Sequence, residues 1–152
     1  MLIIRSAEEL REWAGRQLGS SDWTVIPQDA VDTFADLTGD HQWIHTDIER
    51  AKTSPFGGTI VHGYLTLGLV PRLNATIYRV EGFRYGLNYG LNKVRFPAPL
   101  PVGSRVRLHT KLAEVKDVAN DGLQLVLLHT FECEQVAQKP VCVAEAVVRY
   151  YT

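Results

Sequence analysis

Four long runs of β-branched and aromatic residues fill the second half of the chain and constrain its fold more than any other feature. Short stretches rich in Pro, Gly, Asn and Asp separate the runs, and these residue types are typical of turns. Extended runs joined by such stretches predict long antiparallel strands. The four predicted strands are Phe83–Phe96, Arg105–Val118, Leu123–Val136 and Val141–Tyr151.

The second of these strands indicates which face of the sheet is buried. Apolar and basic residues alternate along it: Val106, Leu108 and Leu112 fall on one face, and Arg105, Arg107 and Lys111 on the other. Successive side chains of a strand point to opposite faces. The strand is therefore predicted to have one dry face and one wet, basic face.

Helical patterns and one short strand occupy the start of the chain. Ser6 and Glu9 have capping-box spacing, and they predict a helix in which Leu10, Trp13 and Leu18 share one side. The segment WTVIP, residues 23–27, predicts a brief strand.

A second helix is predicted after Pro27, and Gly39 is a natural C-terminal stop for it. The apolar residues expected on one side of this helix are Val31, Phe34, Ala35 and Leu37.

The middle of the chain contains the most apolar segment, Thr59–Leu73, which predicts a helix buried on most of its surface. Pro71 predicts a kink or an end near that position. A polar loop, Asp40–Gly58, precedes this helix and holds at most a helical turn or two, within Asp47–Lys52. With no repeat or linker, the pattern predicts one α+β domain over residues 1–152, a long central helix wrapped by a curved antiparallel sheet.

Charge and hydropathy exclude several classes of partner. Sixteen Lys and Arg residues against seventeen Asp and Glu give a net charge of -1, so no overall field attracts nucleic acid or anionic membrane. No run approaches the roughly 20 apolar residues of a membrane span, and the start of the chain becomes charged too early for a signal peptide. We therefore expect a soluble, cytoplasmic protein.

The two cysteines, Cys133 and Cys142, flank a turn and could face each other across a hairpin. Geometry allows a disulfide, but the absence of a secretory signal favours two reduced cysteines in the core.

Asp40 and His45 are the first candidates for chemistry, because a flexible loop can bring both side chains to one water molecule. A carboxylate and an imidazole on one water form a general acid/base pair. The alternative is structural: Asp40 caps the chain entry and His45 forms a local hydrogen bond. Spacing alone favours the structural interpretation.

His62 and Gly63 precede the apolar helix and suggest a carbonyl-binding point. A backbone N–H at a helix start has no intrahelical acceptor, and glycine lets a substrate carbonyl approach it without a clash. Such a donor would stabilise the enolate-like charge of a thioester under attack at C3, which is worth roughly 3 kcal/mol per donor. The alternative is a glycine required for tight packing beside an interior histidine.

Other site types have weaker support. Asp40, His41, His45 and His62 are possible metal ligands by type, but their spacing matches no standard zinc pattern, so we expect no metal. No phosphate-binding loop or nucleophile elbow is present. The basic residues of the strands are either a solvated face or a phosphate-contacting patch. The candidates for phosphate contact are Lys93, Arg95, Arg105 and Arg107.

Three segments together resemble the MaoC-like, (R)-specific enoyl-CoA hydratase family, including its nodulation-protein-N-like branch, and the resemblance runs from Trp23 to Tyr151. The family's hydratase motif is matched by Phe34, Thr38, Gly39, Asp40, Ile44, His45 and Ala51. The resemblance continues through residues 55–70, which enter the central helix, and through residues 92–108, which form a strand, a turn and a strand.

This resemblance implies a hot-dog fold, usually dimeric with sites near the subunit interface. It implies that Asp40 and His45 add water to a trans-2-enoyl-CoA to give an (R)-3-hydroxyacyl-CoA, reversibly, with the Gly63 N–H on the thioester oxygen. No metal or redox cofactor is implied, since CoA is part of the substrate. Acyl-carrier-protein thioesters are the other possible substrates, and fatty-acid metabolism is the broad setting.

The chain departs from the family motif between its two catalytic candidates. Gln42 and Trp43 stand where Asn and Pro are usual, and the Trp variant resembles the nodulation-protein-N-like branch. Gln42 keeps an amide that can form hydrogen bonds, while Trp43 and Tyr64 are expected to shape the substrate pocket. Two alternatives remain open: a hot-dog acyl-CoA thioesterase, and a non-catalytic module that binds acyl-CoA or acyl carrier protein.

Overall fold

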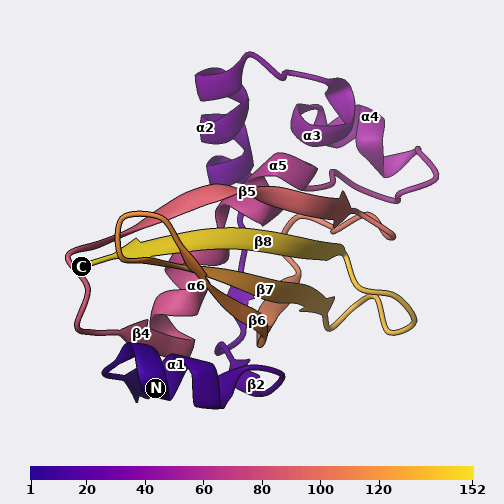
Figure 1. Cartoon of the computed structure of the whole chain (residues 1–152). Coiled ribbons are helices and arrows are strands. Elements are labelled where there is room, and N and C mark those ends of the chain that lie inside the picture. Colours follow the sequence, from indigo (N-terminus) through magenta and orange to yellow (C-terminus); the bar gives the residue numbers. More distant parts are fainter.

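The four predicted strands form the body of one curved antiparallel sheet in the computed structural model, which describes residues 1–152 (Figure 1). They are β5 (Tyr85–Arg95), β6 (Arg105–Val118), β7 (Gly122–Cys133) and β8 (Cys142–Tyr151). Two short strands, β2 (Gln17–Ser20) and β3 (Thr24–Val25), also pair with β6, and the sheet order is β2-β6-β7-β8-β5. The brief strand predicted within residues 23–27 is therefore confirmed.

The turn between β6 and β7 shows why these runs pair as a hairpin. Asn120 and Asp121 adopt positive φ angles of 63° and 51°, a region that Asn and Asp tolerate better than most residues. The turn places Val118 opposite Gly122 and sets the register of the longest strand pair. Local turn chemistry thus fixes which side chains face the core.

The alternation predicted for β6 is confirmed. Val106, Leu108 and Leu112 are fully buried and belong to the hydrophobic core, while Arg105 and Lys111 are exposed. Leu73 and Ile77, from the helix that crosses the sheet, are buried in the same core cluster.

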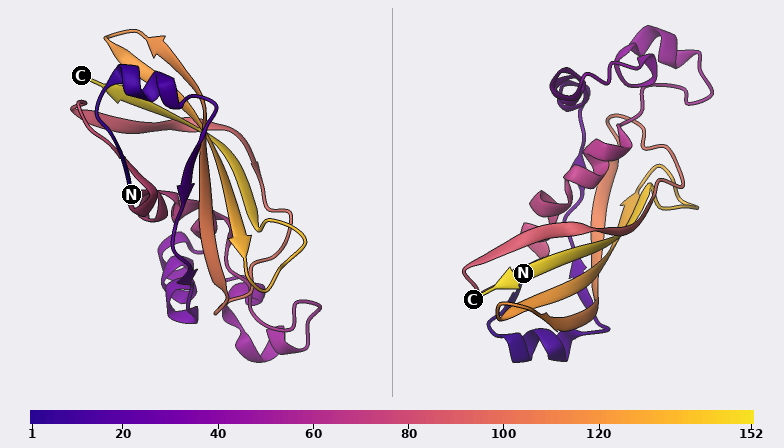
Figure 2. Two further views of the ribbon diagram at one scale, coloured as in Figure 1. Left: turned by 90° about the horizontal axis from the view of Figure 1, so that it is seen from below. Right: turned by 45° about the horizontal axis from the view of Figure 1, so that its top comes forward.

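The predicted central helix is present but interrupted. It consists of α5 (Gly63–Gly68) and α6 (Val70–Ile77), which follow one another along one face of the sheet (Figure 2). Thr59–His62 is extended instead, and Ile60 bridges to Pro101. Pro71 lies in the first turn of α6, where its missing N–H costs no hydrogen bond. The helix is interrupted two residues earlier, at Leu69, which agrees with the kink or end predicted near Pro71.

The expected burial of this helix is also wrong for most of α5. Thr66 is its one buried residue, and Tyr64 is 77% exposed. Apolar composition alone cannot distinguish a surface that faces the core from one available for another contact.

The N-terminal segment forms α1 (Ala7–Trp13) between two strands that were not predicted. Ser6 caps α1 by accepting a hydrogen bond from the Glu9 N–H at 3.2 Å, as its spacing predicted. The helix ends before Gly15, which adopts a φ of +83°, so Leu18 lies in β2 and not in the helix. β1 (Leu2–Ile4) pairs in parallel with β4 (Tyr78–Val80).

Three further helices lie at the opposite end of the sheet from α1 (Figure 1). They are α2 (Gln28–Thr38), α3 (Trp43–Thr46) and α4 (Ile48–Lys52). α2 ends at Gly39 with a φ of 77°, as predicted, but Leu37 is 83% exposed and does not join the buried side. α3 was not predicted, because four residues carry too little periodicity to reveal a helix.

No helix in this structure combines the length and the apolar character that crossing a membrane requires. Cys133 and Cys142 are both buried free thiols, which confirms the reduced state favoured by the sequence.

Candidate active site at the start of α5

His45 is held in one orientation by the main chain of a distant segment. Its Nδ1 lies 2.6 Å from the carbonyl oxygen of Ile60, so Nδ1 carries the proton and donates it. The other ring nitrogen, Nε2, then holds a lone pair that can accept a proton. His45 is only 7% exposed, and its short helix α3 is tied to the chain before α5 by the hydrogen bond from the Ile60 N–H to the Ile44 carbonyl.

Gln28 braces the same histidine from α2. Its side-chain amide donates to the carbonyl of His45 at 2.7 Å, and its amide oxygen accepts a hydrogen bond from the Thr59 hydroxyl at 2.6 Å. One side chain thus links α2, α3 and the strand-like segment before α5. The sequence offered no signal for this role, because Gln28 is separated from its partners by 17 and 31 residues.

His62 lies beneath the site and is sealed from solvent. Its ring stacks on His45 with centroids 3.8 Å apart, its Nε2 donates to the Asp40 carbonyl at 3.0 Å, and Phe34 packs against it. Its Nδ1 is buried without a hydrogen-bond partner. His62 is 2% exposed, as the interior alternative expects, and a contact with substrate stays a prediction.

Asp40 is positioned by the turn that ends α2. Gly39 takes the left-handed conformation, and Asp40 Oδ1 then accepts a hydrogen bond from the Gln42 N–H at 3.4 Å. Its carboxylate is 51% exposed, so solvent and ligands can reach it. Asp40, His45 and His62 each present an oxygen or nitrogen within 4.8 Å of the other two. One water molecule can bridge atoms at this separation.

The same three residues are candidate metal ligands by type, but their orientation does not suit a metal. The two imidazole rings are stacked with centroids 3.8 Å apart and planes only 24° apart, so their lone pairs lie in two nearly parallel planes and are poorly placed to meet on one ion. His45 Nδ1 and His62 Nε2 also donate to carbonyl oxygens. The expectation that no metal is bound remains a prediction.

Gly63 is the first residue of α5, so its N–H has no acceptor within the helix. A Cβ built on Gly63 would approach the ring of Phe96 to 3.0 Å, which shows how closely that ring covers the glycine. Gly63, His45 and Phe96 line one cavity of about 280 Å³. The carbonyl-binding candidate and the imidazole therefore border the same space.

The remaining pocket candidates lie on exposed parts of the site. The Gln42 side chain is exposed, and Trp43 packs under the guanidinium of Arg50 at 4.3 Å. Tyr64 lines a separate cavity between α5 and the sheet. These placements leave the three side chains near the site without a hydrogen bond to the side chains of Asp40 or His45.

The four phosphate candidates separate into two pairs. Arg105 pairs with Glu134 at 3.2 Å, and Arg107 pairs with Glu132 at 2.7 Å. The hydrogen bond from Arg107, aided by one from His109, lowers the pKa of Glu132 and keeps that carboxylate charged.

Lys93 and Arg95 form no ion pair, and both are exposed near the end of β5, next to Phe96. Of the four, these two are the ones available to a phosphate.

Comparisons with known proteins show the family to which this chain belongs. The family described as MaoC like domain matches residues 10–130. The chain is 53% identical over 150 residues to 3-hydroxyacyl-thioester dehydratase Z of Mycobacterium tuberculosis (strain ATCC 25618 / H37Rv), with 99% of both chains covered. It is 49% identical over 102 residues to Nodulation protein N of Rhizobium leguminosarum bv. viciae, covering 66% of this chain and 63% of that protein.

Among solved structures, an R-hydratase from Pseudomonas aeruginosa superposes with a TM-score of 0.69 at 22% identity, covering 91% of this chain and 81% of that chain. A likeness at this identity supports the expected hot-dog fold. In this chain the central helix of that fold is divided into α5 and α6.

Proposed function

This chain belongs to the family of MaoC-like domains, and we propose that Asp40 and His45 carry out its reaction, the reversible exchange of water between 3-hydroxyacyl and trans-2-enoyl thioesters. The protein is a hydratase/dehydratase, that is, a lyase, like its relative of 53% identity. The observation that carries the assignment of residues is the approach of the Asp40 and His45 side chains to within 4.8 Å, with His45 Nε2 left to accept a proton.

In the hydration direction, Asp40 and His45 bind one water molecule. The carboxylate accepts a proton from it, the imidazole orients its oxygen, and the oxygen forms a bond to C3 of the enoyl thioester. The electrons of the C2–C3 double bond move toward the thioester carbonyl. The Asp40/His45 pair then returns the proton taken from water to C2 as the carbonyl reforms. Dehydration runs through the same steps in reverse. No cofactor takes part in this scheme.

The Gly63 N–H is placed to stabilise the charge that develops on the thioester oxygen. The N–H has no intrahelical acceptor, and Gly63 borders the same cavity as His45. Donors of this kind contribute roughly 3 kcal/mol each to transition-state stabilisation. Asp40 and His45 therefore act on the C2–C3 bond while Gly63 acts on the carbonyl.

The finer features of the substrate are also part of the proposal. We assign the (R) configuration to the 3-hydroxyacyl product, in line with the R-hydratase that shares the fold. For a CoA substrate, Lys93 and Arg95 are the phosphate contacts, because both are exposed and form no ion pair.

A homodimer is the oligomeric state that the sheet edge supports. β5 is an edge strand of eleven residues, and it exposes Tyr85, Leu87, Tyr89 and Leu91 by 48% to 60%. A long, apolar, unpaired edge is an aggregation hazard unless another strand covers it. A second copy of β5 related by a two-fold axis would cover both edges at once.

The function is tested by incubating the protein with crotonyl-CoA and following the loss of enoyl absorbance together with the release of free thiol. We expect hydration without thiol release. Thiol release from saturated acyl-CoA would support a thioesterase instead, and tight binding without turnover would support a binding module. Absence of turnover on every chain length would contradict the assignment.

The dimer is tested separately by sedimentation of the wild type and of Leu87→Glu. The substitution places a charge on β5, and two-fold pairing brings two such charges close together. We expect a dimeric wild type and a monomeric variant. A monomeric wild type would overturn the dimer without affecting the proposed reaction.

A further inference from the structure

A groove between the α5–α6 helices and the sheet is separate from the cavity at Gly63 but begins beside it. It consists of two adjoining cavities of about 440 Å³ and 450 Å³, whose shared lining includes Val70 and His129. The first cavity begins at Tyr64, the residue after Gly63, and the second continues beyond Asn74. Eleven residues separate Gly63 from Asn74, which corresponds to roughly 16 Å along a helix at 1.5 Å per residue.

Three polar side chains from α6, β6 and β7 form a hydrogen-bonded chain at the wall of the second cavity. The Thr110 hydroxyl donates to Asn74 Oδ1 at 2.7 Å, and its oxygen lies 3.2 Å from His129 Nδ1. A hydroxyl has one proton to donate, so the His129 contact requires the proton on Nδ1. This leaves His129 Nε2 as an acceptor and Asn74 Nδ2 as a donor, both without a protein partner.

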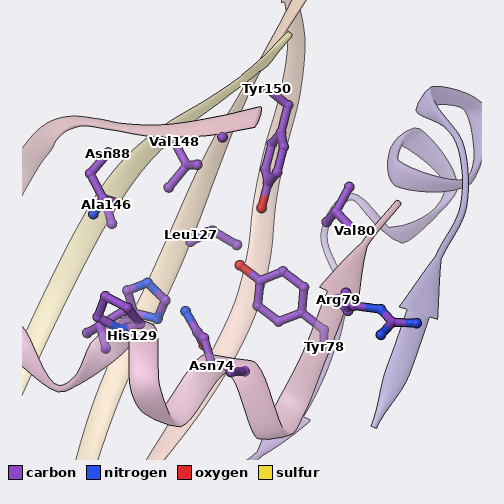
Figure 3. A pocket seen from close by; sticks show the side chains of 14 residues that line it. Asn74, Tyr78, Arg79, Val80, Asn88, Leu127, His129, Ala146, Val148 and Tyr150 are labelled. Atoms are coloured by element: carbon purple, nitrogen blue, oxygen red, sulfur yellow. The ribbon is translucent and has the colours of Figure 1, made fainter. Parts of the chain in front are cut away.

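Both atoms are open to the groove. Asn74 and His129 line the cavity. His62 Nδ1 is sealed from solvent without a partner, whereas Asn74 Nδ2 and His129 Nε2 are not sealed. The Asn74 nitrogen points toward the side of the cavity where the His129 ring lies (Figure 3). Tyr78 and Tyr150 differ, because their hydroxyl groups face each other across the cavity. Asn74 and His129 therefore present a donor and an acceptor to whatever fills the groove.

The chemistry of this pair selects among possible occupants. Burial lowers the pKa of His129 to about 4, so its ring is neutral at pH 7 and Nε2 accepts hydrogen bonds. An alkyl chain would displace water and leave both groups unpaired, which is unfavourable. A carbonyl could accept from Asn74 but could not donate to His129. A hydroxyl group does both.

We infer that the acyl group of the substrate carries a second hydroxyl group near its far end, which accepts a hydrogen bond from Asn74 Nδ2 and donates one to His129 Nε2. The inference rests on the proposed function, which places the thioester at Gly63, and it adds that the acyl chain passes Tyr64 and enters the groove. The substrate class is thus a hydroxylated 2-enoyl or 3-hydroxyacyl thioester. The distance from Gly63 to Asn74 sets the position of the second oxygen along the acyl chain.

The test compares pairs of trans-2-enoyl-CoA substrates with and without a terminal hydroxyl group, in chains of about 8 to 14 carbons, a range chosen to bracket the roughly 16 Å from Gly63 to Asn74. At one chain length we expect kcat/KM for the hydroxylated substrate to exceed that of its plain partner by about tenfold or more, because the plain chain leaves buried polar groups unpaired.

Variants locate the effect. Asn74→Leu and His129→Leu each remove one partner and should lower the hydroxyl preference about tenfold or more, or reverse it. Val70→Ala is the matched control, since Val70 lines the same groove without a polar atom and should change both substrates by the same factor.

Equal kcat/KM for both members of every pair would overturn the inference, and so would variants that keep the wild-type preference. Turnover of crotonyl-CoA would show that the proposed function survives such a failure. If no enoyl-CoA is hydrated, calorimetric binding of decanoyl-CoA and 10-hydroxydecanoyl-CoA to wild type and His129→Leu still decides the point. Tighter binding of the hydroxylated ligand, lost in the variant, supports it, and equal binding overturns it.

Discussion

Two buried histidines lie beside the α5–α6 segment, His45 of α3 near the start of α5 and His129 of β7 along α6, and they are held in different ways. At the start of α5, His45 donates to a main-chain carbonyl, that of Ile60. Along α6, His129 contacts a side-chain hydroxyl, that of Thr110. A main-chain acceptor remains whatever side chain stands at its position, whereas a hydroxyl disappears with one substitution. At the active-site end, here called the reaction end, the histidine is therefore held by the backbone. At the end near Asn74, here called the groove end, the histidine is held by a side chain and depends on its identity.

The largest expected effect comes from the reaction end. Asp40→Asn and His45→Gln should each lower kcat by about 10² to 10⁴, the usual contribution of a positioned general acid or base. The loss should be similar for every enoyl-CoA, because both residues act on the bond that all substrates share. Steady-state kinetics on crotonyl-CoA and on one hydroxylated substrate measures the loss. A variant at Asp40 or His45 that changed the ratio of the two kcat values would contradict the separate roles of the two ends.

The second effect concerns the stability of the groove end at low pH. Burial holds the pKa of His129 at about 4, against 6.5 for the free side chain. The unfolded chain therefore binds a proton that the folded chain does not, and stability is lost as the pH falls from 6.5 toward 4. The loss reaches roughly 3 kcal/mol at 1.36 kcal/mol per pKa unit.

His129→Leu should remove this contribution. Urea unfolding of wild type and variant between pH 7 and pH 4 measures the difference in slope, with the exposed His41→Gln as a control that keeps the wild-type slope. Parallel slopes for wild type and His129→Leu would mean that His129 has no such linkage to folding.

A third prediction compares the supports of the two ends. Gln28→Leu removes the hydrogen bonds to the His45 carbonyl and the Thr59 hydroxyl, and we expect a loss of about 1 to 3 kcal/mol in unfolding free energy. Because His45 then shifts, kcat should fall on all substrates alike. Thr110→Val should cost a similar free energy but change the hydroxyl preference. Denaturation and paired kinetics on both variants test this, and an exchange of the two phenotypes would break the comparison.

The smallest effect concerns the phosphate contacts, which belong to neither end. Arg95→Ala should raise KM for CoA substrates a few-fold, since exposed charge pairs are worth up to about 1 kcal/mol. Arg107→Ala is the matched variant, because that guanidinium already pairs with Glu132 and should leave KM near the wild-type value. The KM of each variant is measured at low salt. Equal increases in KM for both variants would indicate that Arg107 contacts the phosphate as well as Arg95.

Several elements could be predicted from local sequence because the information lies within a few residues. β6 has the predicted bounds, since alternating apolar and basic residues define both its length and its buried face. The Ser6 cap and the stop at Gly39 also follow from local rules. Pro71 indicated a break in the central helix close to the observed one at Leu69. The helix α3 could not be predicted, because a four-residue turn carries no distinct periodicity.

The site shows the same division. The motif around Asp40 and His45 and the glycine at position 63 were recognisable in the sequence, and the fold brings the two side chains of that motif together. The burial of His62 was one of two interpretations that the sequence left open, because a histidine next to a helix start can face either way. The ion pairs that occupy Arg105 and Arg107 involve partners 29 and 25 residues away.

By itself, the sequence determined the strands, the caps and the identity of the candidate catalytic groups, since these depend on side-chain type and short spacing. Only the tertiary structure decided which proton His45 keeps, because the Ile60 carbonyl lies 15 residues away. It also decided what faces the groove. Asn74 and His129 meet through Thr110, across separations of 36 and 19 residues, and a hydrogen bond depends on distance in space and not along the chain.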